Sequence, residues 1–330
     1  MKQFLQKKAK LVFLCMLVLL TCTACANPRG RDGKTLADQI IASEETTIDA
    51  SKINYKDISD KKLKKEIKKN IKDGQYTIQP TTFKNSMSKG WFEGLIVWPI
   101  AQIINLISSK TDAGVGIILT TLLIQMLVFV FTRKSQMSTQ RMQEIQPEIQ
   151  KIQNKYKDKT DERSKMQMAQ EMQNIYQKYD IHPFGSMLIT FIQLPIMMGM
   201  YYATMRSVSV VSGSFMGISL AGTPLDGFKA FDIAYISIYV LMVIFYIVSM
   251  KLPQWLKKWQ DKKDNVKVKK YAQEETNPMA NSMNMSMYFM TAMICIIYIS
   301  WPMAMSFYWL VSSVIRVCQS LILHQVMNKK

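Results

Sequence analysis

Apolar residues are gathered into five long blocks, separated by stretches rich in Lys, Gln and Asn. A helix needs about 20 predominantly apolar residues to cross roughly 30 Å of hydrocarbon, and these blocks approach or reach that length. The predicted spans cover residues 113–132, 187–205, 232–250, 285–300 and 305–323. Residues 301–304 leave room only for a turn, so we expect the last two spans to form a helical pair. The pattern predicts an all-α membrane protein with five transmembrane helices.

A further apolar segment, residues 90–109, precedes the first span. Its pattern is interrupted by polar residues and a proline: Glu93, Pro99, Gln102 and Asn105. Trp91 and Trp98 are typical of the interface between membrane and water. We therefore expect an external amphipathic helix that lies on the outer membrane surface. A sixth crossing is the alternative, and it would invert the topology of the whole chain.

The polar segment between the first two spans, residues 133–182, has a helical repeat of its own. Apolar residues recur at steps of three and four, first as Met142, Ile145, Ile149, Ile152 and Tyr156, then as Met168, Met172, Ile175 and Tyr179. We expect two antiparallel helices packed along one apolar seam, with the polar turn 157–162 between them. Pro147 is tolerable in the first turn of the first helix. Residues 251–284 are predicted to be the loop after the third span, and within it residues 256–278 lack such a period and are predicted to be a flexible linker.

The chain starts with a basic, then apolar, then small-residue segment, residues 1–24, which is typical of a secretory signal. This segment ends in Thr-Ala before Cys25, a sequence that looks like a bacterial lipobox. Cys25 would carry fatty acyl chains such as palmitate and become the mature N-terminus, with Cys22 as the less favoured site. An uncleaved signal anchor is the alternative. Residues 25–89 are expected to form an extracytoplasmic tail on the bacterial cell membrane.

Basic residues predict the orientation. The formal net charge is +18, with ten Lys and Arg in residues 133–182, eight in 251–284 and two in 206–231. Because cytoplasmic loops carry the excess of Lys and Arg, the first two segments are predicted to be cytoplasmic and the third extracytoplasmic. The C-terminal tail, residues 324–330, is then inside. In a soluble protein this charge would suggest nucleic acid. Here it favours retention at anionic membrane lipids, and no nucleic-acid substrate is expected.

Polar residues share one face of several predicted spans. On helical wheels they cluster as Thr121, Gln125 and Thr132 in the first span, Ser186, Thr190, Gln193 and Thr204 in the second, and Trp309, Ser312, Ser313, Arg316 and Gln319 in the fifth. A single Ser, Thr or Gln in a span commonly forms a hydrogen bond that holds two neighbouring helices together. Gln125, Gln193 and Arg316 all lie near mid-span, where an arginine costs about 2.5 kcal/mol or more. We expect a shared wet cavity, and snorkelling of Arg316 to the membrane surface is the alternative.

No constellation typical of an enzyme accompanies these residues. The chain has two histidines, His182 and His324, and five cysteines without metal-ligand spacing. No cofactor, metal or catalytic residue is expected, and the protein is not expected to be an enzyme. A central arginine among five spans is also compatible with a transporter or channel for small anions. Transporters commonly show internal repeats and interrupted helices, and neither is visible in the sequence.

The order of motifs along the chain resembles one family. The motifs are LLIQMLVFVFTRKSQ in the first span, QPEIQKIQNKY in the predicted hairpin, HPFGSMLITFIQLPIMMGMYYATMRS around the second span and WPMAMSFYWLVSSVIRVCQ at the fifth. FIQLPI and FYWLVSS are the most specific pieces. With the lipobox signal, the series resembles the YidC/Oxa/Alb membrane protein insertases in their Gram-positive lipoprotein form, from Trp91 to the C-terminus.

The resemblance implies a five-helix core around a hydrophilic groove that is open to the cytoplasm and to lipid. It also implies an insertase and chaperone that inserts and helps fold newly made membrane proteins, with or without the Sec translocon. The implied partners are nascent membrane proteins, the ribosome, the Sec translocon and membrane lipids. Gln193 and Trp309 match groove residues of the family.

The chain departs from the family pattern at Gln125, where an arginine is usual. Arg316 lies two turns after Trp309 on the same helical face, at a position where the family usually has a small or apolar residue. We hypothesise that the groove charge has moved from the first span to the fifth. The predicted groove residues are Arg316, Gln125, Gln193, Trp309, Thr121, Thr190, Ser312, Ser313 and Gln319.

Overall fold

The computed structural model describes residues 28–157, 159, 161–181, 184–263, 289 and 291–328. The predicted signal segment, Cys25 and residues 264–284 lie outside them. The described residues are mostly helical, with three two-stranded sheets of short strands. The predicted class, an all-α membrane protein, is confirmed.

Contacts divide the chain into two compact units. The first consists of Met1–Thr120 and Leu194–Gly222, and the second of Thr121–Gln193 and Thr223–Lys330. The division falls within two long helices, α5 (Ala113–Glu144) and α8 (Phe184–Arg206), which each contribute to both units.

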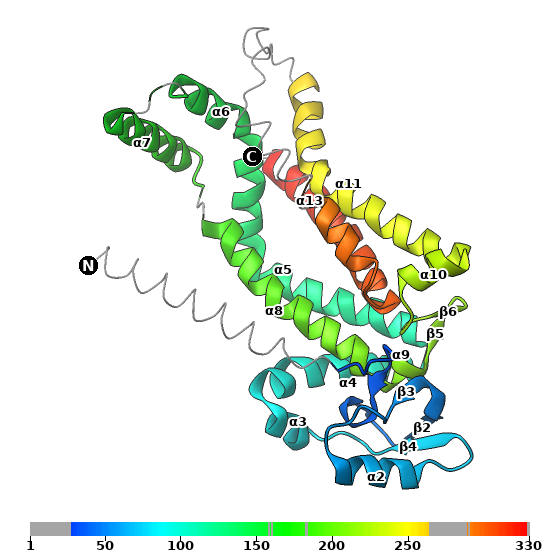
Figure 1. The fold of residues 1–330 in the computed structure, drawn as a ribbon. Helices are drawn as coiled ribbons and strands as arrows, with labels where there is room; N and C mark the ends of the chain where they lie inside the picture. Colours follow the sequence, from blue (N-terminus) through cyan, green and yellow to red (C-terminus); the bar gives the residue numbers. More distant parts are fainter. Residues whose placement is uncertain are drawn as a thin grey trace. The chain divides into compact units, whose positions relative to one another are not determined.

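The first unit contains a folded domain where the sequence predicts only a tail (Figure 1). β1 (Thr35–Leu36) pairs in parallel with β3 (Ile53–Asn54), and β2 (Thr46–Asp49) pairs antiparallel with β4 (Gln75–Ile78). These strands pack with α2 (Lys61–Asn70) and α9 (Val208–Ser212) around a core of Ala37, Ile40, Ala42, Ile48, Ile53, Ile58, Ile67, Ile78, Val208 and Val211. Strands of two to four residues carry too little hydrophobic pattern to be predicted from sequence.

α2 (Lys61–Asn70) shows how a strongly basic segment becomes a packed helix. The Asp60 carboxylate caps its N-terminus by accepting hydrogen bonds from the backbone N–H groups of Lys62 and Leu63. Two lysines in the last turn interact favourably with the negative end of the helix dipole. Ile67 is buried in the core, so one apolar edge holds the helix while the lysines face solvent.

An amphipathic helical stretch follows in the first unit. It consists of α3 (Phe83–Lys89), the π-helical segment η3 (Glu93–Val97) and α4 (Trp98–Ser108). The buried residues of α4 are Ile100, Ala101, Ile104 and Asn105, whereas Trp91, Leu95 and Leu106 are exposed. Large apolar side chains thus lie on both the buried and the exposed face of this stretch. Its location on the membrane surface stays a prediction.

Buried polar side chains connect distant segments of the first unit. The Asn105 side-chain nitrogen donates to a backbone carbonyl in the folded tail at 2.8 Å, and its oxygen accepts from Ser207 Oγ at 2.5 Å. Arg206, the last residue of α8, forms an ion pair with Glu93 and donates to the Gln39 carbonyl oxygen at 2.7 Å. Beyond α9 (Val208–Ser212), β5 (Ser214–Phe215) and β6 (Ile218–Ser219) form a tight hairpin.

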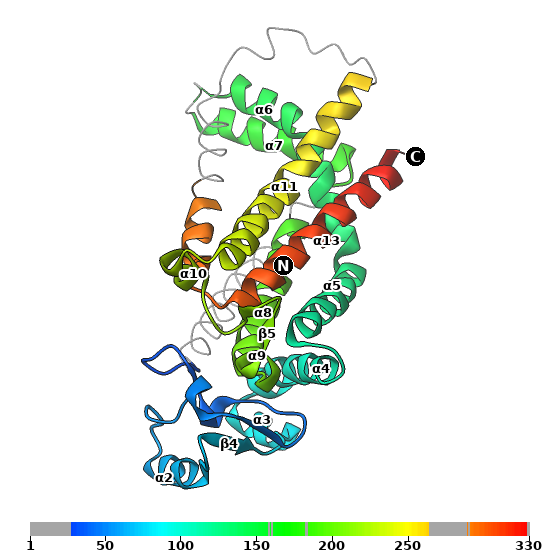
Figure 2. The same ribbon diagram turned by 90° about the vertical axis from the view of Figure 1, so that its right-hand side faces the viewer.

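Long helices make up most of the second unit. α11 (Ile233–Lys263) and α13 (Met303–Asn328) lie side by side in both views (Figures 1 and 2). A short helix, α10 (Pro224–Ala230), precedes α11, and residues 291–298 are helical. α6 (Gln146–Lys155) and α7 (Glu162–Lys178) connect α5 to α8.

Three helices among the described residues are long and apolar enough to cross a membrane. They cover Ala113–Met142, Ile233–Gln260 and Met303–Val326, and they correspond to the first, third and fifth predicted spans. The second predicted span falls within α8, which contains Pro195. The fourth, residues 285–300, is described only at residue 289 and from residue 291 onward. The number five stays a prediction.

Two helices continue past the predicted ends of their spans. α5 extends to Glu144 rather than ending at residue 132, and α11 extends to Lys263 rather than to residue 250. The Lys, Arg, Gln and Met residues that follow each apolar block are good helix formers, so the helix outlasts the block. The prediction of a flexible linker is therefore wrong for residues 256–263, which lie inside α11, as does Pro253 before them.

α6 and α7 pack against each other along the seam expected from the sequence (Figure 1). Ile145, Ile149 and Ile181 are buried there, and Met142, Met172, Ile175, Tyr176 and Tyr179 pack against them. Pro147 lies in the first turn of α6, which is a helix separate from α5. The Asp161 carboxylate caps α7 by accepting the Ser164 N–H at 2.8 Å.

Candidate functional site

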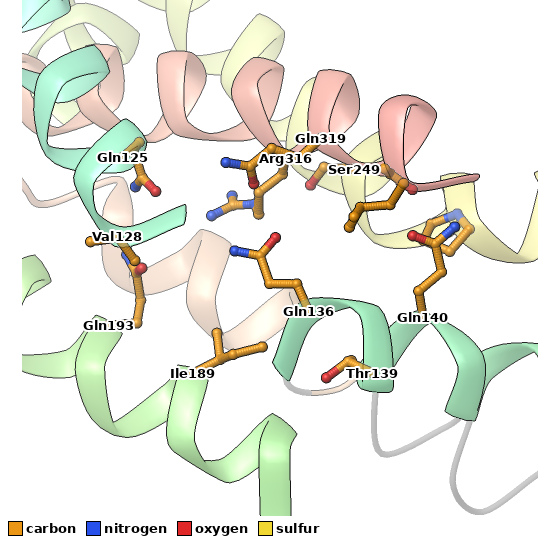
Figure 3. Close-up of a pocket in the computed structure, with 13 residues that line it drawn as sticks. Gln125, Val128, Gln136, Thr139, Gln140, Ile189, Gln193, Ser249, Arg316 and Gln319 are labelled. Carbon is orange, nitrogen blue, oxygen red and sulfur yellow. The ribbon is translucent and has the colours of Figure 1, made fainter. Parts of the chain in front are cut away.

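A cavity of ≈ 210 Å³, lined by both polar and apolar side chains, lies within the second unit (Figure 3). Its walls come from α5, α8, α11 and α13. The lining residues are Gln125, Val128, Gln136, Thr139, Gln140, Ile189, Gln193, Ser249, Pro253, Arg316, Gln319, Ser320 and Leu323. This volume can hold several water molecules, and the polar lining offers them hydrogen-bond partners.

Arg316 supplies the charge of this cavity. Figure 3 shows its side chain directed into the space between Gln125, Gln136 and Gln193. None of the described residues that line the cavity is acidic. Arg316 is 13 residues after the first residue of α13, and so about 20 Å along the helix axis. A guanidinium is therefore held near the middle of a helix that is apolar enough to span a membrane.

Residues of its own helix hold the Arg316 guanidinium in place. Its Nη2 donates to Ser313 Oγ at 2.8 Å, and its central carbon lies 5.7 Å from the centre of the Trp309 ring. Trp309 stacks on Tyr298 with ring centres 5.0 Å apart and meets Tyr246 edge-on at 6.4 Å. The aromatic face stabilises the cation from one side. A planar guanidinium has five N–H donors, so donors remain for an anionic ligand.

Two glutamines tie neighbouring helices to α13. Gln125 on α5 donates to Ser312 Oγ at 3.1 Å, and Gln193 on α8 donates to the Tyr308 hydroxyl at 3.0 Å. Each amide keeps its oxygen beside the cavity that it lines. These bonds fix the two glutamines near Arg316, as the helical wheels predict.

The predicted site residues fall into three groups. Arg316, Gln125, Gln193 and Gln319 line the cavity. Thr121, Trp309, Ser312 and Ser313 are buried and outside the lining, although Trp309, Ser312 and Ser313 contact residues that line it. The side chain of Thr190 and all of Cys25 lie outside the described part of the chain.

The cavity wall formed by Gln136, Thr139 and Gln140 was not predicted from the sequence. All three lie after the apolar block that ends at residue 132, in the part of α5 taken for a separate polar segment. A signal for them exists, because they follow Gln125 by 11, 14 and 15 residues and so return to its face of a helix with 3.6 residues per turn.

One family model and several curated proteins are similar in sequence to this chain. The family model described as 60Kd inner membrane protein matches residues 105–330. Membrane protein insertase YidC 1 of Streptococcus pyogenes serotype M6 is 30% identical over 237 residues, which are 72% of this chain and 75% of that protein. Membrane protein insertase YidC of Enterococcus faecalis is 30% identical over 237 residues, 72% of this chain and 76% of that protein. Membrane protein insertase MisCA of Bacillus subtilis is 27% identical over 238 residues, 72% and 80% of the two chains.

Proposed function

The chain belongs to the 60Kd inner membrane protein family of YidC-type membrane protein insertases, and we propose that its cavity receives hydrophilic segments of nascent membrane proteins. In this proposal Arg316 attracts the acidic residues of those segments. Membership in an insertase family favours this function over the alternative of an anion transporter or channel.

One observation carries the proposal. A single guanidinium, without an acidic lining residue among those described, lies in a cavity that Gln125 borders from the facing helix. In this proposal, α13 supplies the charge that the resemblance places on the first span. A buried charge of one sign in a wet cavity selects the opposite sign in its ligand, so acidic tails and loops are the expected cargo.

The energetics indicate why such a cavity matters. A substrate's apolar span supplies about 0.3 to 0.6 kcal/mol per Leu, Ile, Phe or Val that enters lipid, or roughly 4–7 kcal/mol for a dozen. Each acidic residue of its tail costs about 2.5–3.5 kcal/mol at mid-membrane. Two acidic residues in the tail therefore nearly cancel the favourable transfer free energy of the apolar span. A guanidinium that lowers the free-energy cost of these acidic residues then determines whether the tail crosses the membrane. The protein then acts without catalysing a chemical step.

The proposal also includes a lipid anchor at Cys25 and two macromolecular partners, the ribosome and the Sec translocon. Cys25 lies three residues before the first described residue, Pro28, so acylation there would attach the first unit to the outer membrane surface. The basic loops then face the cytoplasm, together with the C-terminus. There the α6–α7 hairpin, which carries lysines at its tip, is the surface we propose for the ribosome and the Sec translocon.

Substitution of Arg316 tests the proposal. With the full-length protein in proteoliposomes, Arg316→Ala should slow insertion of a single-span substrate with an acidic tail by tenfold or more, about the effect of losing a hydrogen bond between charged groups. Arg316→Lys should retain part of the activity. Arg31→Ala, at an exposed position of the first unit, is the matched control. An unchanged rate for the acidic tail in Arg316→Ala would rule out this role.

A further inference from the structure

Glutamine is the most frequent residue of the cavity wall. Gln125, Gln136, Gln140, Gln193 and Gln319 come from three different helices, α5, α8 and α13. All five line one cavity; Figure 3 shows Gln125, Gln136, Gln193 and Gln319 near Arg316 and Gln140 farther along α5. The Arg316 guanidinium can attract only the acidic residues of a substrate segment. Five neutral amides need a different explanation, because they make no distinction between charged side chains.

The chemistry of the amide points to a ligand. The end of a glutamine side chain carries two N–H donors and one carbonyl acceptor, the same groups that a peptide bond presents. It can therefore donate to a peptide carbonyl and accept from a peptide N–H. Serine or threonine offers a single rotating hydroxyl for both tasks. A row of glutamines suits the one feature that all polypeptides share, their main chain.

The spacing of the glutamines fits an extended chain. Gln136 and Gln140 are four residues apart on α5, about 6 Å along the helix axis. Residues i and i+2 of an extended chain are about 6.6 Å apart and present their peptide groups to the same side. From Gln125 to Gln140 the axial distance is about 22 Å, the length of six or seven extended residues. The row thus matches a short unfolded segment.

Internal hydrogen bonds leave much of this capacity unused. Gln136 Nε2 donates to Thr132 Oγ1 at 2.8 Å, within its own helix. One N–H and the amide oxygen of Gln136 then remain for a ligand. Gln140 lines the cavity and is 6% exposed, so little of its side chain is in contact with bulk solvent. Water can satisfy these groups when the cavity holds no peptide.

We propose that Gln136, Gln140 and Gln319 bind the main chain of the hydrophilic segment, in an extended conformation and whatever its sequence. This inference rests on the proposed function and deepens it, because it separates two kinds of recognition. Arg316 binds the acidic side chains of the substrate segment. The glutamines form hydrogen bonds with its peptide groups, in place of the hydrogen bonds that these groups lose with water. Neutral tails are then also substrates, through the glutamines alone.

Substitution by methionine tests the glutamines. Methionine has a similar length and shape and lacks the amide, so Gln136→Met/Gln140→Met/Gln319→Met keeps the packing and removes the hydrogen bonds. In proteoliposomes, the full-length triple variant should insert acidic and neutral tails alike about tenfold more slowly, the effect of losing two neutral hydrogen bonds. Arg316→Ala should slow only the acidic tail. Gln325→Met, at an exposed position of α13, is the matched control.

The substrate offers a second test that leaves the protein unchanged. A neutral tail with proline at alternate positions lacks half of its N–H donors, and it should insert several-fold more slowly than the same tail with alanine. The triple variant should insert the two neutral tails at similar rates, since both lose the same partners. Equal rates for the two tails with the unmodified protein would overturn the proposal. So would a triple variant that inserts the neutral alanine tail as fast as the unmodified protein.

These outcomes are distinct from failure of the proposed function. If the unmodified protein inserts none of the tails, the proposed function itself is wrong. If Arg316→Ala slows neutral and acidic tails equally, only the role of Arg316 is wrong. A triple variant that does not assemble would be recognised by its lost thermal transition, and the comparison of proline and alanine tails then decides the question.

Discussion

Arg316 has the surroundings of a charge that is stabilised and still accessible. Ser313 and Trp309, three and seven residues earlier on α13, contact the guanidinium. Neither is anionic, so neither neutralises it. The side chain lies in the cavity, whereas snorkelling would require it to extend along α13 toward the helix end. A positive charge without an acidic neighbour in the described lining keeps its full attraction for an anionic ligand.

Exchange of two residues tests whether the charge belongs to the cavity or to one helix. Arg316→Ser should lose the preference for acidic tails, and Gln125→Arg/Arg316→Ser should regain most of it. The reason is that both positions line one cavity, so an arginine on α5 reaches the same space. Relative insertion rates of acidic and neutral tails provide the measurement. If the double variant behaves like Arg316→Ser, position 316 has a role that charge in the cavity does not explain.

The positive charge of the cavity, Arg316, and the glutamines beside it were predictable from the sequence. Helical wheels place Gln125, Gln193 and Arg316 together because each lies on a polar face of an otherwise apolar block. Ser320 and Leu323 were missed because helical phase alone does not reveal which helices border a cavity. Such lining requires the packing of α13 against its neighbours.

Hydrophobic periodicity predicts where the helices of the second unit lie along the chain. It does not predict the residues at which they end. The seam of the α6–α7 hairpin was predictable because its apolar residues recur at helical spacing. The ends of α5 and α11 were not, since polar residues with high helix propensity continue a helix without any change that the apolar pattern records. This error also hid the part of the cavity wall formed by Gln136 and Gln140.

The core of the hairpin should depend on its isoleucines. Ile149 is 5% exposed between α6 and α7, so Ile149→Ala should destabilise the hairpin by about 2–4 kcal/mol through lost burial and a cavity. Faster hydrogen exchange in α6 and α7 of the full-length protein measures the effect. Met166→Ala, at a position that is 72% exposed, is the control and should change exchange little. Equal effects of the two substitutions would contradict the packing.

An exposed ion pair should make the hairpin sensitive to acid. Lys155 Nζ donates to Glu171 Oε1 at 2.5 Å and the Tyr156 hydroxyl donates to the same oxygen at 2.9 Å. These hydrogen bonds, Lys155 first, hold the pKa of Glu171 below its usual value. A carboxyl with a lowered pKa stabilises the fold above its unfolded pKa of about 4.3, and this contribution disappears as the pH falls through the folded pKa.

Spin labels at the exposed positions Lys151 and Lys165 would report the separation of α6 and α7. Below pH 4 the distance distribution should broaden in the unmodified protein, because protonation of Glu171 removes the acceptor for Lys155. In Glu171→Gln the distribution should already be broader at pH 7 and change less on acidification. A distribution independent of pH from 7 to 3 in the unmodified protein would exclude this contribution.

At the scale of the whole molecule, the folded first unit is the main feature beyond sequence prediction. Its core is assembled from residues 37–78 and from α9, more than a hundred residues later in the chain. Single-sequence periodicity does not report such long-range contacts. The membrane class and the family were predictable, because they depend on long apolar blocks and on contiguous motifs. Residues 28–89 have neither signal.

The buried ion pair between Arg206 and Glu93 should stabilise this unit. The two side chains are 6% and 12% exposed, and they join the end of α8 to η3. Glu93→Gln should cost about 3–5 kcal/mol, because it leaves an uncompensated buried guanidinium. Glu93→Leu/Arg206→Leu should cost less, since both charges are removed. Hydrogen-exchange protection of residues 28–89 in the full-length protein measures both, and a double variant less stable than the single variant would contradict this account.

Reversal of the cavity charge tests the central claim most directly. Arg316→Glu places a carboxylate where the guanidinium lies, and insertion is measured with two substrates that differ only in the sign of their tail charge. The account predicts that the preference reverses, with the basic tail inserted faster than the acidic one, while the unmodified protein shows the opposite order. An Arg316→Glu variant that is folded and keeps the preference for acidic tails would show that Arg316 does not select the cargo.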